Sequence, residues 1–340
     1  MKKQFKIYQK QIALLLSVLF IFSCSKDDDS RTQATIDVYV AGYELLGDNN
    51  VSKIWKNGIE TKLTDGVNSS STNSVYISEG DVYVAGNEDR TAIIWKNGNA
   101  IPLTDGINFA YANSVFVSKG DVYVAGSERN ATNSVAVLWK NNVKIPLADG
   151  INFSSATSVF VSGDDVYVAG SESNGVQNVA KIWKNGVAIP LSDGINFARV
   201  NSLFISGDDV YAAGFESVNS NSVVKFWKNG QETSLTDGTN EARANSIFVS
   251  GNDVYVVGYE TLNSNGVAKI WKNGEETSLT DGSSFAMATS VFVFEDDVYI
   301  TGFENIDSGA AVKLWKNGEE AILATGSNEA SGSGVFVVSN

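Results

Sequence analysis

One glutamate recurs at the same place in each of seven internal repeats of the 340-residue chain, two residues after a glycine. A carboxylate at this position can pair with a lysine across a hairpin, which contributes about 0.2 to 1 kcal/mol per pair. Alternatively, the seven carboxylates form a ring that faces a ligand. The series is Glu44, Glu88, Glu128, Glu172, Glu216, Glu260 and Glu304.

Lysine accompanies most but not all of these glutamates. Five repeats carry a lysine in the next apolar segment, whereas Ile93 and Val137 take its place in the other two. Pairing therefore does not explain Glu88 and Glu128, and both interpretations of the series stay open. The five lysines are Lys53, Lys181, Lys225, Lys269 and Lys313.

The composition excludes several common classes of enzyme site. The chain has no histidine, which removes Ser-His-Asp triads and histidine-ligated zinc. Paired carboxylates can hydrolyse glycosides, but a catalytic pair normally breaks the symmetry of a repeat array, and no such departure is evident. Calcium-loop spacings are absent as well. We therefore expect no catalytic residues, metal or cofactor, with a carbohydrate-active enzyme (glycoside hydrolase or lyase) using Asp or Glu as the alternative.

The glutamates belong to a repeat with a period of 40 or 44 residues. Such a period indicates an array of supersecondary units that cannot bury their apolar faces alone. The tripeptide Asp-Val-Tyr begins at Asp37, Asp81, Asp121, Asp165, Asp209, Asp253 and Asp297. All seven tryptophans follow the same steps, at Trp55, Trp95, Trp139, Trp183, Trp227, Trp271 and Trp315. We expect these aromatic residues to pack between neighbouring units.

Each repeat contains four short apolar segments. In the fourth repeat they are 159–161, 166–169, 179–183 and 188–191, and they are rich in β-branched and aromatic residues. The first two segments are separated by Gly163-Asp164 and the last two by Asn185-Gly186, which are typical of tight hairpin turns. The repeat is therefore predicted to be a four-stranded antiparallel meander.

Two features of the meander can be predicted in more detail. Prolines 102, 146 and 190 all fall in the fourth segment, which identifies it as the exposed edge strand. If the hairpin between the second and third segments is regular, Gly170 lies opposite Trp183 and Glu172 opposite Lys181. The Trp183 ring would then cover the bare backbone of Gly170.

The ends of the array predict how it closes. The first repeat lacks its first strand and begins at Asp37, while the chain ends with a solitary strand at 333–338. If this last strand joins the first sheet, every sheet has four strands. Residues 35–340 are therefore predicted to form an all-β, seven-bladed β-propeller whose closing blade contains both termini.

The repeat resembles known propeller sequences in part. Val-Tyr-Val-Ala-Gly resembles the YVTN-type repeat, and the order of a Gly-ended strand, a polar loop and an apolar-Trp-x-Asn-Gly strand is similar to HAF-type extracellular repeats. Together these cover about residues 35–340. The resemblance implies an extracellular or envelope propeller, but such folds carry unrelated functions.

The N-terminal region indicates export. Residues 1–23 combine a basic start with an apolar run of 11 residues at 12–22, as in a lipoprotein signal peptide. The run ends in Ile-Phe-Ser-Cys, which resembles a bacterial lipobox and implies acylation (palmitate) at Cys24, although an ordinary signal peptide with an incidental cysteine is the alternative. Residues 24–34 would form an acidic tether, and Lys26 followed by Asp27–Asp29 resembles a surface-export signal of Gram-negative outer-membrane lipoproteins.

Charge narrows the choice of partners. Removing residues 1–23 takes away four lysines and no acid, so the net charge falls from -14 to -18. Nucleic acid needs a basic surface and is not expected as a partner, and the membrane is expected to be reached only through the lipid. We expect a monomeric, non-catalytic, lipid-anchored binding or scaffolding protein at the cell surface.

The expected ligand is a glycan or another envelope protein. Loops that follow the second and fourth strands should emerge on one face of the ring, where Asn108-Phe109, Asn152-Phe153 and Asn196-Phe197 accompany Asp-Gly turns. Such pairs can bind sugars by hydrogen bonding and stacking. Turn chemistry explains the Asp-Gly pairs equally well, and the phenylalanines can simply fill gaps between blades.

Overall fold

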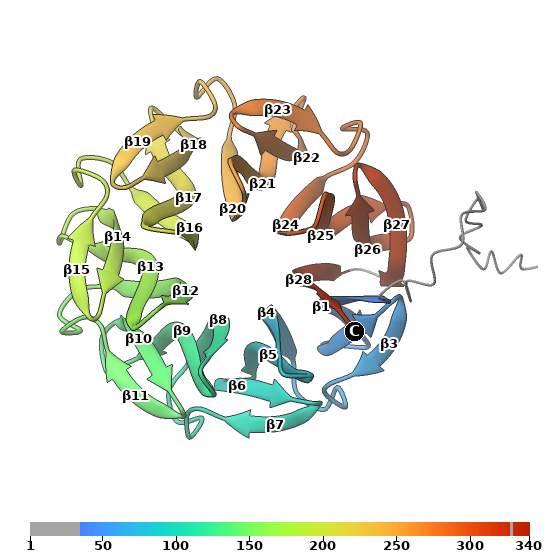
Figure 1. Cartoon of the computed structure of the whole chain (residues 1–340), viewed down its shortest axis with the longest axis horizontal. Helices are drawn as coiled ribbons and strands as arrows, with labels where there is room; N and C mark the ends of the chain where they lie inside the picture. The colour runs from blue at the N-terminus through green and yellow to red at the C-terminus, as the bar shows by residue number, and fades with distance from the viewer. Residues whose placement is uncertain (1–34, 327–328) are drawn as a thin grey trace, which may run out of the picture. The chain divides into compact units, whose positions relative to one another are not determined.

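The computed structural model describes residues 35–326 and 329–340, and these residues form seven four-stranded antiparallel sheets. Figure 1 shows the sheets arranged as blades around a common axis, with the first strand of each blade innermost. Blade 1 contains strands β28, β1, β2 and β3, and blades 2 to 7 follow in chain order. The predicted seven-bladed propeller is confirmed.

Strands at the same position in different blades have similar lengths. The inner strands are β4 (Ser70–Ser78), β8 (Ala110–Ser118), β12 (Ser154–Ser162), β16 (Ala198–Ser206), β20 (Ala242–Ser250), β24 (Ala286–Phe294) and β28 (Ala330–Ser339). The second strands are β1 (Ile36–Leu46), β5 (Asp81–Glu88), β9 (Asp121–Arg129), β13 (Asp165–Ser173), β17 (Asp209–Val218), β21 (Asp253–Leu262) and β25 (Asp297–Ile306). The third strands are β2 (Asn49–Lys56), β6 (Thr91–Lys96), β10 (Ser134–Lys140), β14 (Asn178–Lys184), β18 (Asn221–Lys228), β22 (Asn265–Lys272) and β26 (Gly309–Lys316). The outer strands are β3 (Ile59–Lys62), β7 (Asn99–Pro102), β11 (Val143–Pro146), β15 (Val187–Pro190), β19 (Gln231–Ser234), β23 (Glu275–Ser278) and β27 (Glu319–Gly326).

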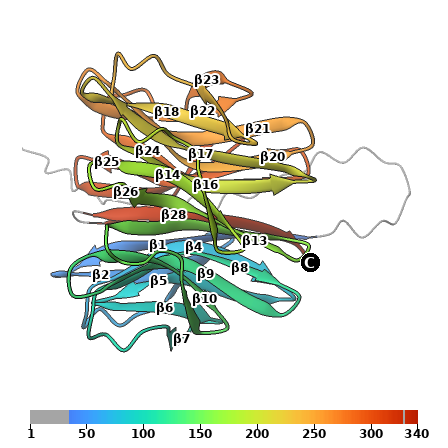
Figure 2. The same ribbon diagram turned by 90° about the vertical axis from the view of Figure 1, so that its left-hand side faces the viewer.

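The ring closes as the sequence predicts. The C-terminal strand β28 pairs antiparallel with β1, and its register places Val337 opposite Val38 and Val335 opposite Val40. Figure 2 shows the two strands side by side. Because β1 also pairs with β2, the first blade contains segments from both ends of the described region.

Turn chemistry fixes the hairpin between the third and outer strands. In blade 4, Asn185 and Gly186 have φ values of 50° and 81°, the left-handed pair that a type I′ turn requires. The outer strand that follows, β15, is exposed along its whole length and ends at Pro190, which confirms that it is an edge strand.

Tryptophan fills the interface between neighbouring blades. Trp183 of blade 4 is fully buried and packs with Tyr123, Ala125 and Leu138 of blade 3. All seven tryptophans are at most 1% exposed, so the prediction that they pack between blades is confirmed. No hydrogen-bond partner for the indole nitrogens is present among the described residues.

An unbroken belt of aromatic rings joins the inner strands. Successive ring centroids from Tyr76 through Phe116 and on to Phe336 are 4.6 to 5.1 Å apart, and the Phe336 ring returns to Tyr76 at 5.0 Å. Tilted rings at this spacing attract one another beyond simple burial. The belt therefore contributes to closure at the seam between first and last strands.

The predicted register between the second and third strands is wrong by two residues. Gly170 lies opposite Lys181 and Trp183 lies opposite Val168, because the strands continue to Ser173 and Asn178 before the chain turns. The tryptophan nevertheless reaches the glycine diagonally in blades 1 to 3. In blade 3, for example, a Cβ on Gly126 would lie 2.8 Å from the Trp139 ring.

The N-terminal predictions lie outside the described residues. The signal peptide at 1–23, the lipidation site Cys24 and the acidic tether at 24–34 all precede Thr35. Within residues 35–326 and 329–340, no helix is long and apolar enough to cross a membrane.

Candidate functional site

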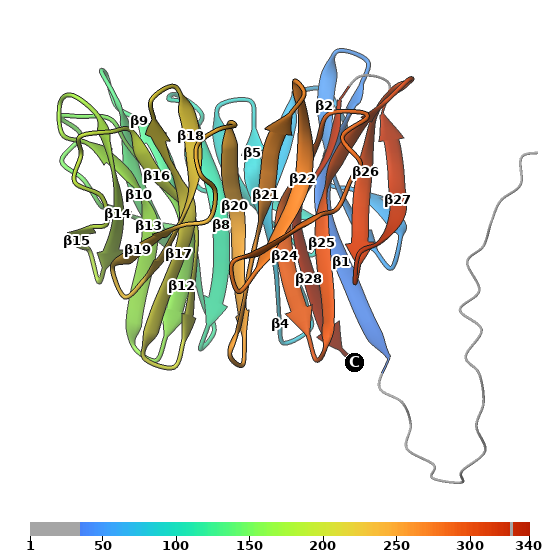
Figure 3. The same cartoon turned by 90° about the horizontal axis from the view of Figure 1, so that it is seen from above.

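Loops after the second and outer strands emerge on the same side of the ring, as predicted. Figure 3 shows the hairpins between second and third strands along one edge of the blades, and the hairpins between inner and second strands along the other. Side-chain hydrogen bonds join the two kinds of loop. In blade 4, for example, Asn174 Nδ2 donates to Gly194 O at 3.1 Å. We call this side the loop face.

The Asp-Gly turns of the loop face use their carboxylates internally. Asp149 Oδ1 accepts a hydrogen bond from the backbone nitrogen of Ile151 at 2.9 Å, and Asp105 and Asp193 make the same contact two residues on. Their carboxylates therefore hold the loop in shape, which agrees with the turn-chemistry interpretation.

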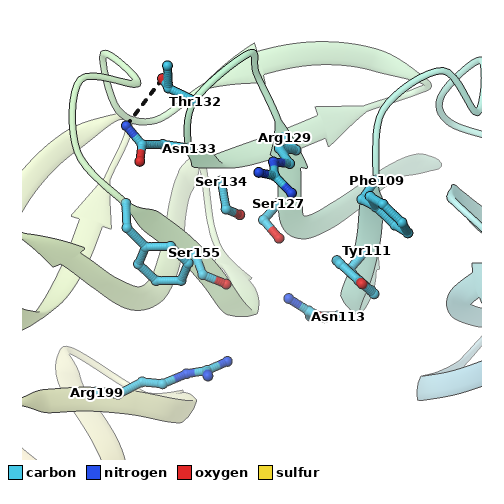
Figure 4. Close-up of a pocket in the computed structure, with 11 residues that line it drawn as sticks. Phe109, Tyr111, Asn113, Ser127, Arg129, Thr132, Asn133, Ser134, Ser155 and Arg199 are labelled. Atoms are coloured by element: carbon cyan, nitrogen blue, oxygen red, sulfur yellow. Dashed lines mark hydrogen bonds between the residues drawn. The ribbon is translucent and has the colours of Figure 1, made fainter.

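Two pockets open on the loop face near the inner strands. The larger has a volume of about 640 Å³ and is lined by Phe109, Tyr111, Arg129, Phe153 and Arg199, among others. The three aromatic side chains are 40 to 43% exposed. In Figure 4 the Arg199 side chain extends from β16 toward the space that Asn113 and Ser155 also face.

The second pocket has a volume of about 470 Å³ and shares Arg199 with the first. Its lining includes Arg243, Phe215 and Tyr259. Neither lining contains an aspartate or a glutamate, although acids outnumber bases in the chain by 39 to 25. We call the two together the arginine pockets.

The sheet register sets each arginine beside an aromatic ring. Arg199 lies opposite Phe215 on β17, and Arg243 lies opposite Tyr259 on β21. The Arg243 guanidinium also lies 4.5 Å from the centroid of the Phe215 ring, and its Nε donates to Glu241 at 2.8 Å. Arg243 is thus fixed both by stacking and by an ion pair.

Arg199 is less well satisfied than Arg243. Its Nε is buried, and no hydrogen-bond partner for this atom is present among the described residues. Burial and, secondarily, the positive charge of Arg243 lower the pKa of the Arg199 guanidinium. A guanidinium stays protonated in proteins, so this lowering reports an uncompensated positive charge rather than a neutral side chain.

A β-bulge in each inner strand lies two residues after the position that Arg199 and Arg243 occupy. In blade 5 the pairing shifts between Val200 and Ser202, and Asn201 at the bulge donates to Ala244 O of the next blade at 2.7 Å. Such bulges redirect side chains next to functional sites. Here the bulge fixes one blade to the next, and Arg199 lies two residues before it on the loop side.

The seven repeated glutamates lie apart from the arginine pockets, since none of them belongs to either lining. Glu44, Glu172, Glu216, Glu260 and Glu304 each form an ion pair with the lysine of the third strand, on the diagonal rather than directly opposite. Ligand contact by the seven carboxylates stays a prediction.

Blades 2 and 3 depart from this pattern in different ways. In blade 3 the basic partner comes from the outer strand β11, where Lys144 Nζ lies 2.9 Å from Glu128. In blade 2, no basic group within 4.0 Å of Glu88 is found among the described residues. Within the same described residues, no cluster of three or more Cys, Asp or Glu could hold a metal ion.

The sequence contains a signal for the arginine pockets that the repeat analysis missed. The residue two positions before each bulge varies from blade to blade, and this is the broken symmetry that the glutamate series lacks. The position is occupied by Ser71, Tyr111, Ser155, Arg199, Arg243, Met287 and Ser331. For the loop phenylalanines Phe109, Phe153 and Phe197, the sequence left sugar contact and gap filling both open, and all three line the pockets.

Comparison with known proteins adds little beyond these observations. No family model and no curated protein sequence matches the chain. Dipeptidyl peptidase 4 from Porphyromonas gingivalis is 12% identical with a TM-score of 0.45, and the match covers 85% of this chain and 51% of that one. A putative TolB from Agrobacterium tumefaciens is 8% identical with a TM-score of 0.46, over 90% of this chain and 99% of that one.

A third solved structure gives a similar result. TolB from Acinetobacter baumannii is 11% identical with a TM-score of 0.45, over 70% of this chain and 61% of that one. This chain therefore spans about half the length of the peptidase. Similarities this low carry no argument about activity, and the fold assignment rests on the strand order of the molecule itself.

Proposed function

We propose that this protein is a non-catalytic binding protein of the bacterial cell envelope that holds a glycan on its loop face. The observation that carries the proposal is the pair of arginine pockets. Exposed aromatic rings at Phe109, Tyr111 and Phe153 lie beside amide and guanidinium groups, in a pocket of about 640 Å³. Aromatic faces with nearby polar groups suit a sugar ring, which has one apolar face and a rim of hydroxyls. An envelope protein that docks on the same face is the other partner considered.

The site is built on rigid elements, which favours recognition without rearrangement. Arg199, Tyr111 and Arg243 belong to inner strands that pair with second strands and bond across to the next blade. Side chains held by strands and neighbouring packing are more precisely placed than side chains on loops. Binding should therefore need little ordering of the protein.

The proposal favours binding over hydrolysis because of where the carboxylates lie. Glycoside hydrolysis needs two carboxyl groups on either side of the scissile bond. The pocket linings contain none, and the repeated glutamates that pair with lysine are mostly buried. A carbohydrate-active enzyme would have to assemble its acids elsewhere on the ring.

Attachment to the envelope is part of the same proposal. The lipobox-like sequence ending at Cys24 and the propeller-repeat resemblance support a lipid-anchored outer-membrane protein with the ring displayed at the cell surface. Replacing Asp27–Asp29 by alanine and testing protease access on whole cells examines the surface placement. Reduced cleavage of the ring in intact cells is expected, whereas unchanged cleavage would reject the export signal.

Binding and turnover can be measured on the soluble ring, residues 25–340. We expect a glycan array to give ligands that the ring binds without releasing products in a hydrolysis assay. The double change Phe109→Ala and Phe153→Ala should weaken binding, because each exposed ring supplies a stacking surface. The matched control is Ile59→Ala on the outer strand β3, where the side chain is 73% exposed and distant from the pockets in sequence and blade position. Product release, or equal binding by both variants, would contradict the proposal.

A further inference from the structure

We propose that the arginine pockets select an acidic oligosaccharide, one whose sugar units carry carboxylates, as in a uronic acid polymer. This inference rests on the proposed function and specifies its ligand class. It comes from the charge distribution, the unsatisfied guanidinium and the repetition of the site along successive blades.

The arginines are separated from the lysines that end the third strands. The four arginines of the described region, Arg90, Arg129, Arg199 and Arg243, all lie on the loop face or directly below it, and three of them line the pockets. The lysines that end the third strands lie at the opposite side of the blades. Each of these lysines pairs with the first aspartate of a second strand at 2.6 to 2.8 Å.

The consequence is a local reversal of charge. A chain with net charge -14 exposes a pair of pockets that contain three arginines and no acid in their linings. Among the described residues, Glu241 beside Arg243 is the one acid that forms an ion pair with a pocket arginine. Such a concave positive site in an otherwise acidic protein concentrates anions, while the acidic surface elsewhere repels them.

Arg199 and Arg243 are spaced to act on the same ligand. They occupy the same position in adjacent blades, both line the second pocket, and their positive charges oppose each other. The buried Nε of Arg199 lacks a partner among the described residues. A carboxylate satisfies guanidinium donors with two parallel hydrogen bonds, so it would remove both the repulsion and the unmet donor.

Aromatic groups beside the arginines favour an acidic sugar over an acidic peptide. Phe215 and Tyr259 lie opposite Arg199 and Arg243 in the sheets, and Phe197 stacks near Phe215 with ring centroids 5.8 Å apart. A pyranose unit presents its apolar face to such a ring while its carboxylate reaches the adjacent guanidinium. Extended peptides carry their carboxylates on flexible side chains without a comparable flat face.

The site also repeats with the blades. A basic residue pairs with an aromatic one in three blades: Arg129 with Phe109 in blade 3, Arg199 with Phe215 in blade 5 and Arg243 with Tyr259 in blade 6. A repeating site fits a repeating ligand. A uronate oligomer presents one carboxylate per sugar, so several units can be bound by one molecule.

The test uses hexagalacturonate as the acidic probe and maltohexaose as the neutral one, each titrated calorimetrically into the ring at low and high salt. Hexagalacturonate should bind, and the double variant Arg199→Gln/Arg243→Gln should weaken binding by about tenfold or more for each arginine removed. The control, Lys62→Gln/Lys119→Gln, removes the same charge from exposed sites outside the pockets and should change binding less than threefold.

Each outcome has a defined meaning. Retained hexagalacturonate binding in the arginine double variant, or equal loss in the lysine control, would overturn the inference. Maltohexaose binding that is as strong and insensitive to the arginine changes would overturn it while leaving the proposed function intact. Equal affinity for poly-L-glutamate would show a general polyanion site or an acidic peptide partner, and thus contradict the sugar assignment. If the ring binds neither sugar and no glycan on the array, both the inference and the proposed function fail.

Discussion

Replacing Lys313 by methionine should destabilise the ring far more than replacing Lys316, three residues later on β26, by methionine. The Lys313 side chain is 4% exposed, and its Nζ lies 2.8 Å from Glu304, whose side chain is 16% exposed. It also contacts Glu320, which is 39% exposed and can turn to solvent. Removing one member of a buried pair leaves an uncompensated charge, which costs about 3 to 5 kcal/mol.

The free energy of unfolding lost in Lys313→Met depends mainly on the mostly buried carboxylate of Glu304. The contact with the exposed Glu320 contributes only about 0 to 1 kcal/mol, as exposed ion pairs generally do. A second change, Glu304→Gln, should therefore restore much of the stability lost in Lys313→Met. Blade 2 already has Ile93 in the position of this lysine, which shows that an apolar side chain fits there.

Lys316→Met is the matched control on the same strand. Lys316 is 42% exposed and pairs with Asp297, so its loss should cost about 0.2 to 1 kcal/mol. Urea unfolding followed by tryptophan fluorescence measures both variants, because all seven indoles are buried between blades. Equal free-energy losses for Lys313→Met and Lys316→Met, or no rescue by Glu304→Gln, would refute the argument that burial decides the strength of these pairs.

Three other predictions concern the repeated glutamate, the strand glycine and pH. Glu172→Gln should lower the free energy of unfolding by about 1 to 3 kcal/mol, because Glu172 accepts a hydrogen bond from Lys181 at 2.6 Å. The change should leave glycan affinity unchanged. A loss of affinity in calorimetry would instead assign the carboxylate to ligand binding. Gly170→Ala should lower the melting temperature sharply, because its Cβ would lie 2.0 Å from Ser155 O. The control, Gly163→Asn, lies in an open turn and should melt near the wild-type temperature. A wild-type melting temperature for Gly170→Ala would show that the two strands can move apart to admit the methyl group. Burial opposes the charged form of Lys313, but the hydrogen bonds that its Nζ donates to Glu304 and Glu320 outweigh burial and raise the pKa of Lys313 above the ordinary 10.5. The stabilisation from this lysine is therefore present below pH 10.5 and is lost as pH rises through the folded-state pKa. Wild type should therefore lose more stability than Lys313→Met between neutral pH and pH values above 10.5 in unfolding titrations, and parallel losses would contradict this.

The fold was predictable because its determinants are local and repeated. Asn185-Gly186 specifies a hairpin without reference to the rest of the chain, and Pro190 marks an edge strand by lacking a donor. Ring closure followed from counting strands at the two ends, and the pairing of Val40 with Val335 confirms it. The same turn and edge-strand signals recur in successive blades, so each blade supports the prediction independently.

The register between second and third strands was not predictable in the same way. The loop at 174–177 contains Asn174-Gly175, a two-residue turn signal, but the loop is four residues long. The Asn174 side chain shapes it by accepting hydrogen bonds from the backbone nitrogens of Val176 and Gln177. Register in a hairpin follows from loop geometry, which such a loop does not reveal in sequence. The result was an error of two residues, which kept every side chain on its correct face but moved the lysine pairing to a diagonal.

The arginine pockets depend on contacts between blades, and this limits what sequence can show. Arg199 and Arg243 are 44 residues apart and meet only because adjacent blades place the same position side by side. Repeat analysis favours positions that stay constant, such as the glutamates, and these proved to lie mostly in ion pairs. In this molecule the variable positions of the inner strands line the pockets that we propose bind the ligand.

Hydroxyl-radical footprinting of the ring with and without hexagalacturonate tests the central claim, that ligand binds at the arginine pockets of the loop face. Phe109, Tyr111 and Phe153, which are 40 to 43% exposed in the free protein, should become protected, while the exposed Ile59 and Val143 of outer strands should not change. Protection of the outer strands, or unchanged oxidation of the three aromatic rings under saturating ligand, would contradict the claim.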